Sequence, residues 1–204
     1  MSRPYQVLAA PCEFMFEEKR STFTAVLSPA QEREVALAQL ETLRRERPGA
    51  SHYCWAYILG AAAQPKSMAF SDDGEPGGTA GKPMLNVLEH REAGNCMAVV
   101  VRTFGGTKLG AGGLVRAYGA AVSGALDVAR WSVVTPSIGI SIAVGFALEE
   151  RVRHCLEQHQ ITVVAADYTT EVTLTANVPE SAVSTITEEL RELTSGAARI
   201  RPAD

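Results

Sequence analysis

The chain has 204 residues, of which 46% are hydrophobic and 21% are charged, and its formal net charge is −4. This composition is typical of a folded globular protein and excludes a disordered chain, while the length fits one large domain or two small ones. The longest apolar run, residues 138–148, is shorter than the ~20 residues of a membrane-spanning helix, and the N-terminus lacks the apolar core of a secretory signal. We therefore expect a cytoplasmic protein without a membrane partner.

Charge is divided unevenly along the chain. Residues 1–130 carry 14 Lys+Arg and 13 Asp+Glu, whereas residues 131–204 carry 5 and 10. The acidic C-terminal part argues against broad binding of a phosphate backbone there, and leaves room for a local cationic site in the first part. The four cysteines, which are Cys12, Cys54, Cys96 and Cys155, are isolated and lack the spacing of a zinc ribbon or a thioredoxin-like motif, so we predict reduced, packed thiols. No metal site and no cofactor are assigned.

The first part of the chain alternates between strand and helix patterns. The predicted elements are strands at 5–10 and 21–27, an amphipathic helix at 32–47, strands at 52–59 and 96–103, and helices at 84–90 and 114–128. The last helix is rich in alanine and glycine, so we expect it to approach a neighbouring sheet closely.

The pattern changes after Trp131 and Pro136. Strands are predicted at 137–144, 161–166, 171–178 and 197–201, with helices at 147–158 and 180–193. The resulting order is βαββαβ, which is typical of a ferredoxin-like domain.

The first segment that suggests chemistry is the loop at residues 71–83. Thr79 is a suitable N-cap, so that Thr79, Ala80 and Gly81 would form a helix N-terminus able to meet an anion, with Lys82 as a nearby cation. The carboxylates of this loop would either bind a metal or satisfy turn amides, and they are Asp72, Asp73 and Glu75.

The second segment, residues 102–118, places a glycine loop between a buried strand and a helix, which is phosphate-loop geometry. It matches neither common fingerprint, because Ala111 stands where a Walker A loop needs Lys, and Val115 where a dinucleotide loop needs Gly. The alternative is that the glycines serve tight turning and close packing. The candidate anion- or nucleic-acid-binding residues are Arg102, Gly105, Gly106, Lys108, Gly110, Gly112, Gly113 and Arg116.

His52 and Cys54 form a third candidate, because a strand would place both on one face. His52 could activate a Cys54 nucleophile, but no third orienting residue is recognisable. The alternative is a packed thiol beside a histidine with its own hydrogen bonds. For Tyr118, which belongs to the second segment, the alternative to a role in the site is packing in the core.

These segments together resemble the IMPACT/YigZ family. The blocks that carry the resemblance are residues 52–56, 71–76, 78–83, 105–106, 109–110, 112–114 and 116–118. The resemblance implies an α+β protein with an S5 domain 2-like α/β sandwich at residues 1–132 and, at residues 133–204, a ferredoxin-like domain resembling domain V of elongation factor G. Eukaryotic members of the family regulate translation initiation through a protein partner. We do not expect this chain to bind the same partner.

We therefore expect a translation-associated regulator that contacts RNA, the ribosome or a translation-related protein through its glycine-rich, cationic loops. The alternative is a phosphate- or nucleotide-dependent enzyme that uses Asp72, Asp73 or Glu75 as base or metal ligand. Both hypotheses require the two glycine-rich segments to lie together.

Overall fold

The computed structural model describes residues 3–203, which divide into two compact units. The first unit is Tyr5–Val134, and the second contains the chain from Thr135 onward together with the described residues before Tyr5. Both units combine helices and strands, which confirms the expected α+β character. None of the helices in residues 3–203 is long and apolar enough to cross a membrane.

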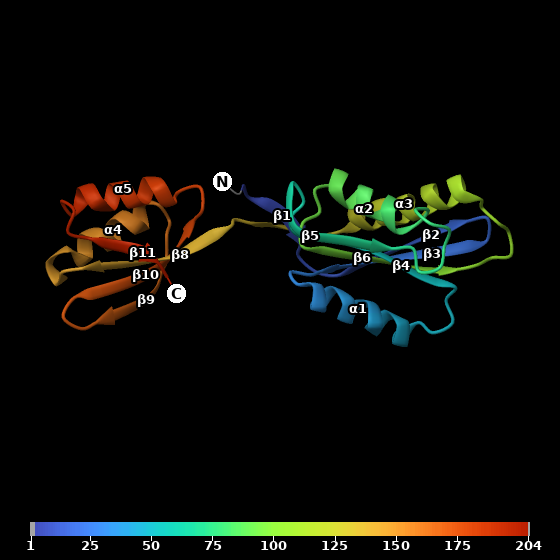
Figure 1. Cartoon of the computed structure of the whole chain (residues 1–204), viewed down its shortest axis with the longest axis horizontal. Helices are drawn as coiled ribbons and strands as arrows, with labels where there is room; N and C mark the ends of the chain where they lie inside the picture. The colour runs from blue at the N-terminus through green and yellow to red at the C-terminus, as the bar shows by residue number, and fades with distance from the viewer. Residues whose placement is uncertain (1–2, 204) are drawn as a thin grey trace. The chain divides into compact units, whose positions relative to one another are not determined.

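The first unit is a sheet covered by helices on both faces. Its elements are β1 (Tyr5–Leu8), β2 (Cys12–Glu18), β3 (Ser21–Pro29), α1 (Arg33–Glu46), β4 (His52–Ala61), β5 (Gln64–Ser71), α2 (Gly81–His90), β6 (Cys96–Thr103), α3 (Ala111–Val128) and β7 (Trp131–Val134). Five strands form an antiparallel sheet in the order β2-β3-β6-β4-β5, and β1 pairs separately with β7. Helices α2 and α3 cover one face and α1 covers the other (Figure 1).

Alternation along the strands creates a core on each face of this sheet. On β3, Phe23, Ala25 and Leu27 are buried against α2 and α3, whereas Val26 packs on the α1 side. The central strand β6 is buried from Cys96 to Arg102, because helices cover it from both sides. The first unit is therefore a three-layer α/β arrangement.

Helix α3 approaches the sheet as closely as its small residues predicted. Ala117, Ala121 and Ala125 are buried, and a Cβ at Gly124 would lie 2.4 Å from the Phe14 ring of β2. A larger side chain at Gly124 would push the helix away from β2.

The second unit has its own sheet and core. Its elements are β8 (Ser137–Val144), a 3₁₀ turn at Phe146–Leu148, α4 (Glu149–Gln158), β9 (Val163–Tyr168), β10 (Val172–Pro179), α5 (Val183–Leu193) and β11 (Arg199–Pro202). The sheet order is β11-β8-β10-β9, with antiparallel neighbours. Alternate residues of β10 are buried with residues of α4 and α5, so the helices cover one face of this sheet.

Some elements differ from the sequence prediction. Strands β2, β5 and β7 were not predicted, and α2 and α3 each begin three residues earlier than expected, at Gly81 and Ala111. Glycines at the start of a helix resemble a loop in sequence. At the start of α2 the packing is tight, because a Cβ at Gly81 would lie 2.8 Å from the Ser71 carbonyl oxygen. Helix α5 begins at Val183 rather than at residue 180, because the Ala182 amide first closes a turn onto the Pro179 carbonyl.

Candidate functional site

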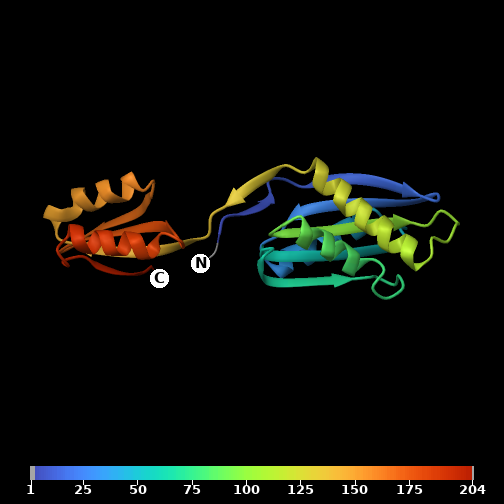
Figure 2. The same ribbon diagram turned by 90° about the horizontal axis from the view of Figure 1, so that it is seen from above.

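The two glycine-rich loops lie at the same edge of the five-stranded sheet. Strands β5 and β6 both run antiparallel to β4, so they are parallel to each other and end at one edge. Residues 72–80 follow β5 and residues 104–110 follow β6. Figures 1 and 2 both show the second of these loops beside the β2–β3 turn. We call the region formed by residues 19–20, 72–80 and 104–110 the loop end.

The Glu75 carboxylate joins the first loop to the second. It is buried, and its Oε1 accepts hydrogen bonds from the Arg102 guanidinium at 2.5 Å and from the Tyr118 hydroxyl at 2.7 Å. Arg102 is near the end of β6, and Tyr118 is on α3. The second loop is therefore anchored to Glu75 through residues on both of its sides.

Arg102 is part of the protein interior. Its side chain is only 6% exposed, and its guanidinium carbon lies 5.3 Å from the Phe23 ring centroid and 5.6 Å from that of Phe104. Two aromatic faces and one carboxylate thus stabilise a cation that water hardly reaches. This geometry makes Arg102 a structural partner of Glu75 and takes it out of the set of cations that an external anion can reach.

His52 and Cys54 lie beside this network at alternate positions of β4, and Cys54 belongs to the core on the face covered by α2 and α3. The Nδ1–H of His52 donates to the Asp73 carbonyl at 2.8 Å, and its Nε2 is 3.9 Å from Glu75 Oε2. The Cys54 sulfur lies 3.0 Å from the Asp72 carbonyl oxygen. Burial raises the pKa of Cys54 to about 12. A pKa this high favours the protonated thiol at neutral pH, whereas a nucleophilic cysteine has a lowered pKa.

The Asp72 carboxylate caps helix α2. It accepts hydrogen bonds from the amides of Gly78 at 2.7 Å, Ala80 at 3.0 Å and Gly81 at 2.9 Å. The prediction that Thr79 caps this helix was wrong: the N-cap residue is Ala80, and the Thr79 hydroxyl donates to the Pro76 carbonyl. The helix amides expected to meet an anion already meet a carboxylate of the protein.

Asp73 is also held by internal contacts. One carboxylate oxygen accepts from the Arg44 guanidinium at 2.8 Å, and the other accepts from the Tyr53 amide at 2.6 Å. Asp73 itself has a φ of +44°. Both Asp72 and Asp73 therefore satisfy amides and a guanidinium. Within residues 3–203, the one grouping of three metal-binding side chains lies in the second unit, away from these carboxylates.

The β2–β3 turn contacts the second glycine loop. A Cβ at Gly105 would lie 1.9 Å from the Arg20 carbonyl oxygen, and the Gly105 amide donates to the Ser21 hydroxyl. Only glycine fits here. The turn residues Lys19 and Arg20 have φ values of +49° and +66°, a conformation that favours Asn or Gly. Two long cationic side chains thus occupy turn positions for which smaller residues are better suited.

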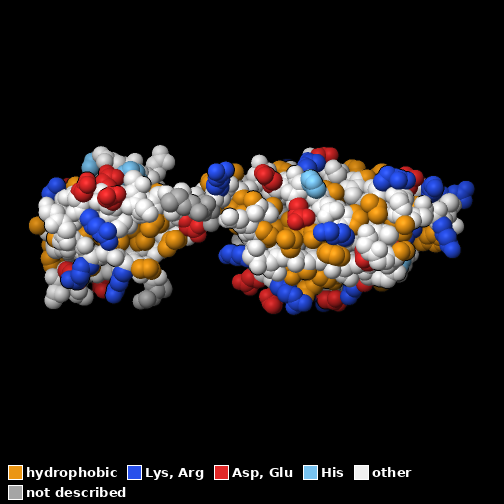
Figure 3. Space-filling view, turned by 45° about the horizontal axis from the view of Figure 1, so that its top comes forward, with side chains coloured by type: hydrophobic (Ala, Val, Ile, Leu, Met, Phe, Trp, Pro, Cys, Tyr) orange, Lys and Arg blue, Asp and Glu red, His pale blue; other side chains and the backbone are white. Residues whose placement is uncertain are grey.

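The exposed groups of the loop end are cationic and aromatic. Lys19, Arg20 and Lys108 are exposed, and Phe104 is 45% exposed. Across residues 3–203, no ion pair joins these three cations to a carboxylate. Figure 3 shows Lys and Arg side chains gathered at this end of the first unit.

Helix α3 begins next to Lys108 without a side-chain cap. Its N-cap is Gly110, whose φ of +74° suits glycine, and no side chain of the described chain caps it. Ala111 and Gly112 are exposed, and the Arg116 guanidinium lies near Gly112, 3.6 Å from where a Cβ would be. An exposed and uncapped helix N-terminus beside two cations is a favourable position for an anion.

The remaining predicted residues have local roles. Gly106 has a φ of +87°, and a Cβ at Gly113 would lie 2.9 Å from the Leu109 side chain, so these glycines permit the turn and close packing. Lys82 is exposed in the first turn of α2 and lies 5.9 Å from the Phe70 ring centroid. Sequence reasoning missed Lys19, Arg20 and Phe104 as site residues. The adjacent cations in a predicted strand–strand connection were the available signal for the first two.

Two protein-family models match the chain, one in each of the two units. Residues 19–126 match the model described as "Impact N-terminal domain", and residues 142–197 match a "Domain of unknown function (DUF1949)".

Individual relatives cover nearly the whole chain. A protein of Haemophilus influenzae described as "IMPACT family member" is 34% identical, with 94% of this chain and 93% of the relative covered. The "IMPACT family member YigZ" of Escherichia coli is 36% identical, with 94% of each chain covered. A crystal structure described only as "an hypothetical protein" is 34% identical and matches with a TM-score of 0.72, over 100% of this chain and 99% of its own.

Proposed function

Because the chain belongs to the IMPACT family, we propose that it is a translation-associated, cytoplasmic protein whose loop end binds RNA, either free or within the ribosome. Family membership supports the link to translation. The choice of RNA as the ligand depends on the chemistry of the loop end.

RNA is proposed as the ligand because exposed cations lie together with an exposed aromatic ring at the loop end. Lys19, Arg20 and Lys108 are exposed and form no ion pair with a carboxylate of residues 3–203, and they share the loop end with the exposed ring of Phe104. Cations that meet phosphates and an aromatic face on which a base stacks are the two elements of single-stranded nucleic-acid binding. The open N-terminus of α3 adds amides that can bind a phosphate.

The exposure of these groups favours an extended polyanion over a small phosphate compound. The cations lie on surface loops and a hairpin turn, whereas sites for small ligands are usually enclosed and lined by apolar side chains. The alternative enzyme, with Asp72, Asp73 or Glu75 as base or metal ligand, has less support, because all three carboxylates are engaged in internal hydrogen bonds.

The proposal also includes a fold assignment for each of the two units. We assign residues 1–132 to an S5 domain 2-like domain and residues 133–204 to a ferredoxin-like domain resembling domain V of elongation factor G; the βαββαβ order and the β11-β8-β10-β9 sheet support the latter. On β8 and β10, the face turned away from the helices carries small residues, which include Ser141, Ala143, Thr173 and Thr175. Because this face lacks stacking aromatics on both strands, RNA binding is assigned to the first unit.

The test is RNA binding by the full chain at several salt concentrations. Fluorescence anisotropy with a single-stranded RNA, a tRNA and a ribosomal RNA fragment would be combined with ribosome co-sedimentation. The variant Lys19→Ala/Arg20→Ala/Lys108→Ala is expected to bind more weakly and to reduce the slope of log K against log salt by about one per cation that contacts phosphate.

A matched control removes the same charge elsewhere on the first unit. Arg33, Lys66 and Arg130 are exposed cations outside the loop end, and the triple alanine variant at these positions should bind like the wild type. Absence of binding to every RNA and to ribosomes would overturn the proposal. Equal losses in the two triple variants would show a general charge effect and would also contradict it.

A further inference from the structure

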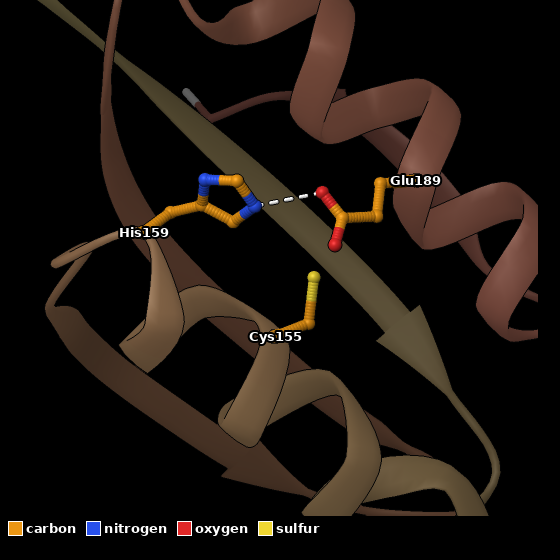
Figure 4. A group of neighbouring side chains, drawn as sticks. All are labelled: Cys155, His159 and Glu189. Carbon is orange, nitrogen blue, oxygen red and sulfur yellow. Dashed lines mark hydrogen bonds and ion pairs between the residues drawn. The ribbon is translucent and has the colours of Figure 1, made fainter.

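Three side chains with metal-binding atoms meet between α4 and α5 of the second unit. Cys155 lies on α4, His159 directly follows that helix, and Glu189 lies on α5. The Cys155 sulfur, a His159 ring nitrogen and a Glu189 carboxylate oxygen all lie within 4.8 Å of one another. Figure 4 shows the three side chains pointing toward a common centre.

We propose that Cys155, His159 and Glu189 bind one divalent transition-metal ion of the zinc class. Thiolate sulfur, imidazole nitrogen and carboxylate oxygen together suit Zn²⁺ better than Mg²⁺ or Ca²⁺, which prefer oxygen ligands alone. The i, i+4 spacing places Cys155 and His159 on one face of the helix, and α5 supplies the third ligand. Water would complete a four-coordinate site.

The observed distances require only small movements to reach metal geometry. Metal–ligand bonds of roughly 2.0–2.3 Å place the ligand atoms of a tetrahedral zinc site about 3.5 Å apart. Without metal, His159 Nε2 lies 2.7 Å from Glu189 Oε2, as a direct hydrogen bond. The ion would replace the proton between these two atoms. The His159 and Glu189 side chains are 38% and 42% exposed and can move, whereas the buried Cys155 is a fixed anchor.

The surroundings also favour a cation. His159 is the C-cap residue of α4, where the helix dipole has its negative end. Burial, and then the negative charge of Glu189, raises the pKa of Cys155. On binding, the sulfur–metal bond replaces the S–H bond, and the proton is released to solvent.

Cobalt titration of the reduced, chelator-treated full chain tests this site. Co²⁺ serves as the probe, because a cobalt–thiolate bond gives a near-ultraviolet charge-transfer band and a tetrahedral site gives strong visible bands. We expect one Co²⁺ per chain with both features, and loss of both on addition of Zn²⁺. Cys155→Ser should abolish the charge-transfer band, and His159→Ala and Glu189→Gln should each weaken binding at least about tenfold.

Neighbouring residues provide matched controls. His154 and Glu188 are exposed and adjacent to two of the ligands, so His154→Ala and Glu188→Gln should bind Co²⁺ like the wild type, as should Cys12→Ser in the first unit. A wild-type chain without the charge-transfer band, or a band that persists in Cys155→Ser, would overturn the site. So would unchanged affinity in both His159→Ala and Glu189→Gln. If Cys155→Ser does not fold, the site is tested by the wild-type spectrum and by the Co²⁺ affinities of His159→Ala and Glu189→Gln.

Discussion

At the scale of single residues, the buried carboxylate of Glu75 connects the two loops of the candidate site. Glu75→Gln removes the charge that compensates Arg102, while keeping the size of the side chain. Breaking a buried ion pair in this way costs about 3–5 kcal/mol. We expect a loss of this size in the free energy of unfolding of the first unit, measured by urea denaturation. Tryptophan fluorescence reports on this unit, because it contains both Trp55 and Trp131.

An exposed glutamate provides the comparison for Glu75. Glu41 pairs with Arg44 on α1, and the two side chains are 62% and 37% exposed. Glu41→Gln should therefore change the stability by less than about 1 kcal/mol. Equal and small effects at Glu75 and Glu41 would show that the buried network does not hold the loops.

The buried thiols of the first unit predict a loss of stability in alkali. Burial raises the pKa of Cys54 from 9.0 to about 12 and also raises that of Cys96. Above pH 9 the unfolded chain loses these protons while the folded chain keeps them, so the free energy of unfolding falls as the pH rises. The slope reaches about 1.4 kcal/mol per pH unit for each thiol.

Fluorescence-monitored urea unfolding at pH 8, 9 and 10 measures this slope. Cys54→Ser removes one titrating thiol, so its slope should be shallower than that of the wild type, by a difference that grows across this range and approaches about 1.4 kcal/mol per pH unit at pH 10. If the wild-type stability is flat over this range, or the slope is unaffected by the substitution, the assignment of Cys54 as a protonated buried thiol is wrong.

At the scale of helices and loops, Asp72 determines the start of α2. Asp72→Ala removes the acceptor of three amides at the helix N-terminus, and should destabilise the first unit by about 1–2 kcal/mol. Asp72→Asn keeps one acceptor oxygen and should lose less. Asp127→Ala is the matched control, because Asp127 forms only an exposed pair with Arg91. If Asp127→Ala lowers the free energy of unfolding as much as Asp72→Ala does, the role of Asp72 as a helix cap is contradicted.

The sequence predicted best those strands whose bounds are set by the apolar residues of the strand itself. The buried strands at residues 96–103 and 137–144 were predicted with their observed bounds, because each is an apolar run between clear breaks. The starts of α2 and α3 were not, because both helices begin in glycine-rich segments that resemble loops in sequence. Sequence could also place Glu75, Arg102 and Tyr118 in candidate segments but could not pair them, because their contacts join segments far apart in the chain.

Spatial proximity also accounts for the parts of the site that sequence missed. Lys19 and Arg20 are more than 80 positions from Lys108, and only the sheet order brings the β2–β3 turn beside the second glycine loop. Arg102, in contrast, looked like an available cation in sequence because nothing local reveals its carboxylate partner.

At the scale of the whole molecule, the two units have separate hydrophobic cores. One core unites Val172, Leu174 and Ile186 with their neighbours in the second unit, and no core cluster of the described residues mixes the two units. We therefore expect two unfolding transitions in urea. Far-ultraviolet circular dichroism should detect both, and tryptophan fluorescence only that of the first unit. Glu75→Gln should shift the fluorescence midpoint and leave the other transition in place. One coincident transition that shifts as a whole would contradict this.

The central claim is that RNA binds at the loop end of the first unit, and amide chemical shifts measured during an RNA titration of ¹⁵N-labelled full chain test it most directly. We predict that the largest changes occur together at Lys19, Arg20 and residues 104–112. Changes confined to residues 137–202, or no changes at RNA concentrations that saturate the anisotropy signal, would contradict the account.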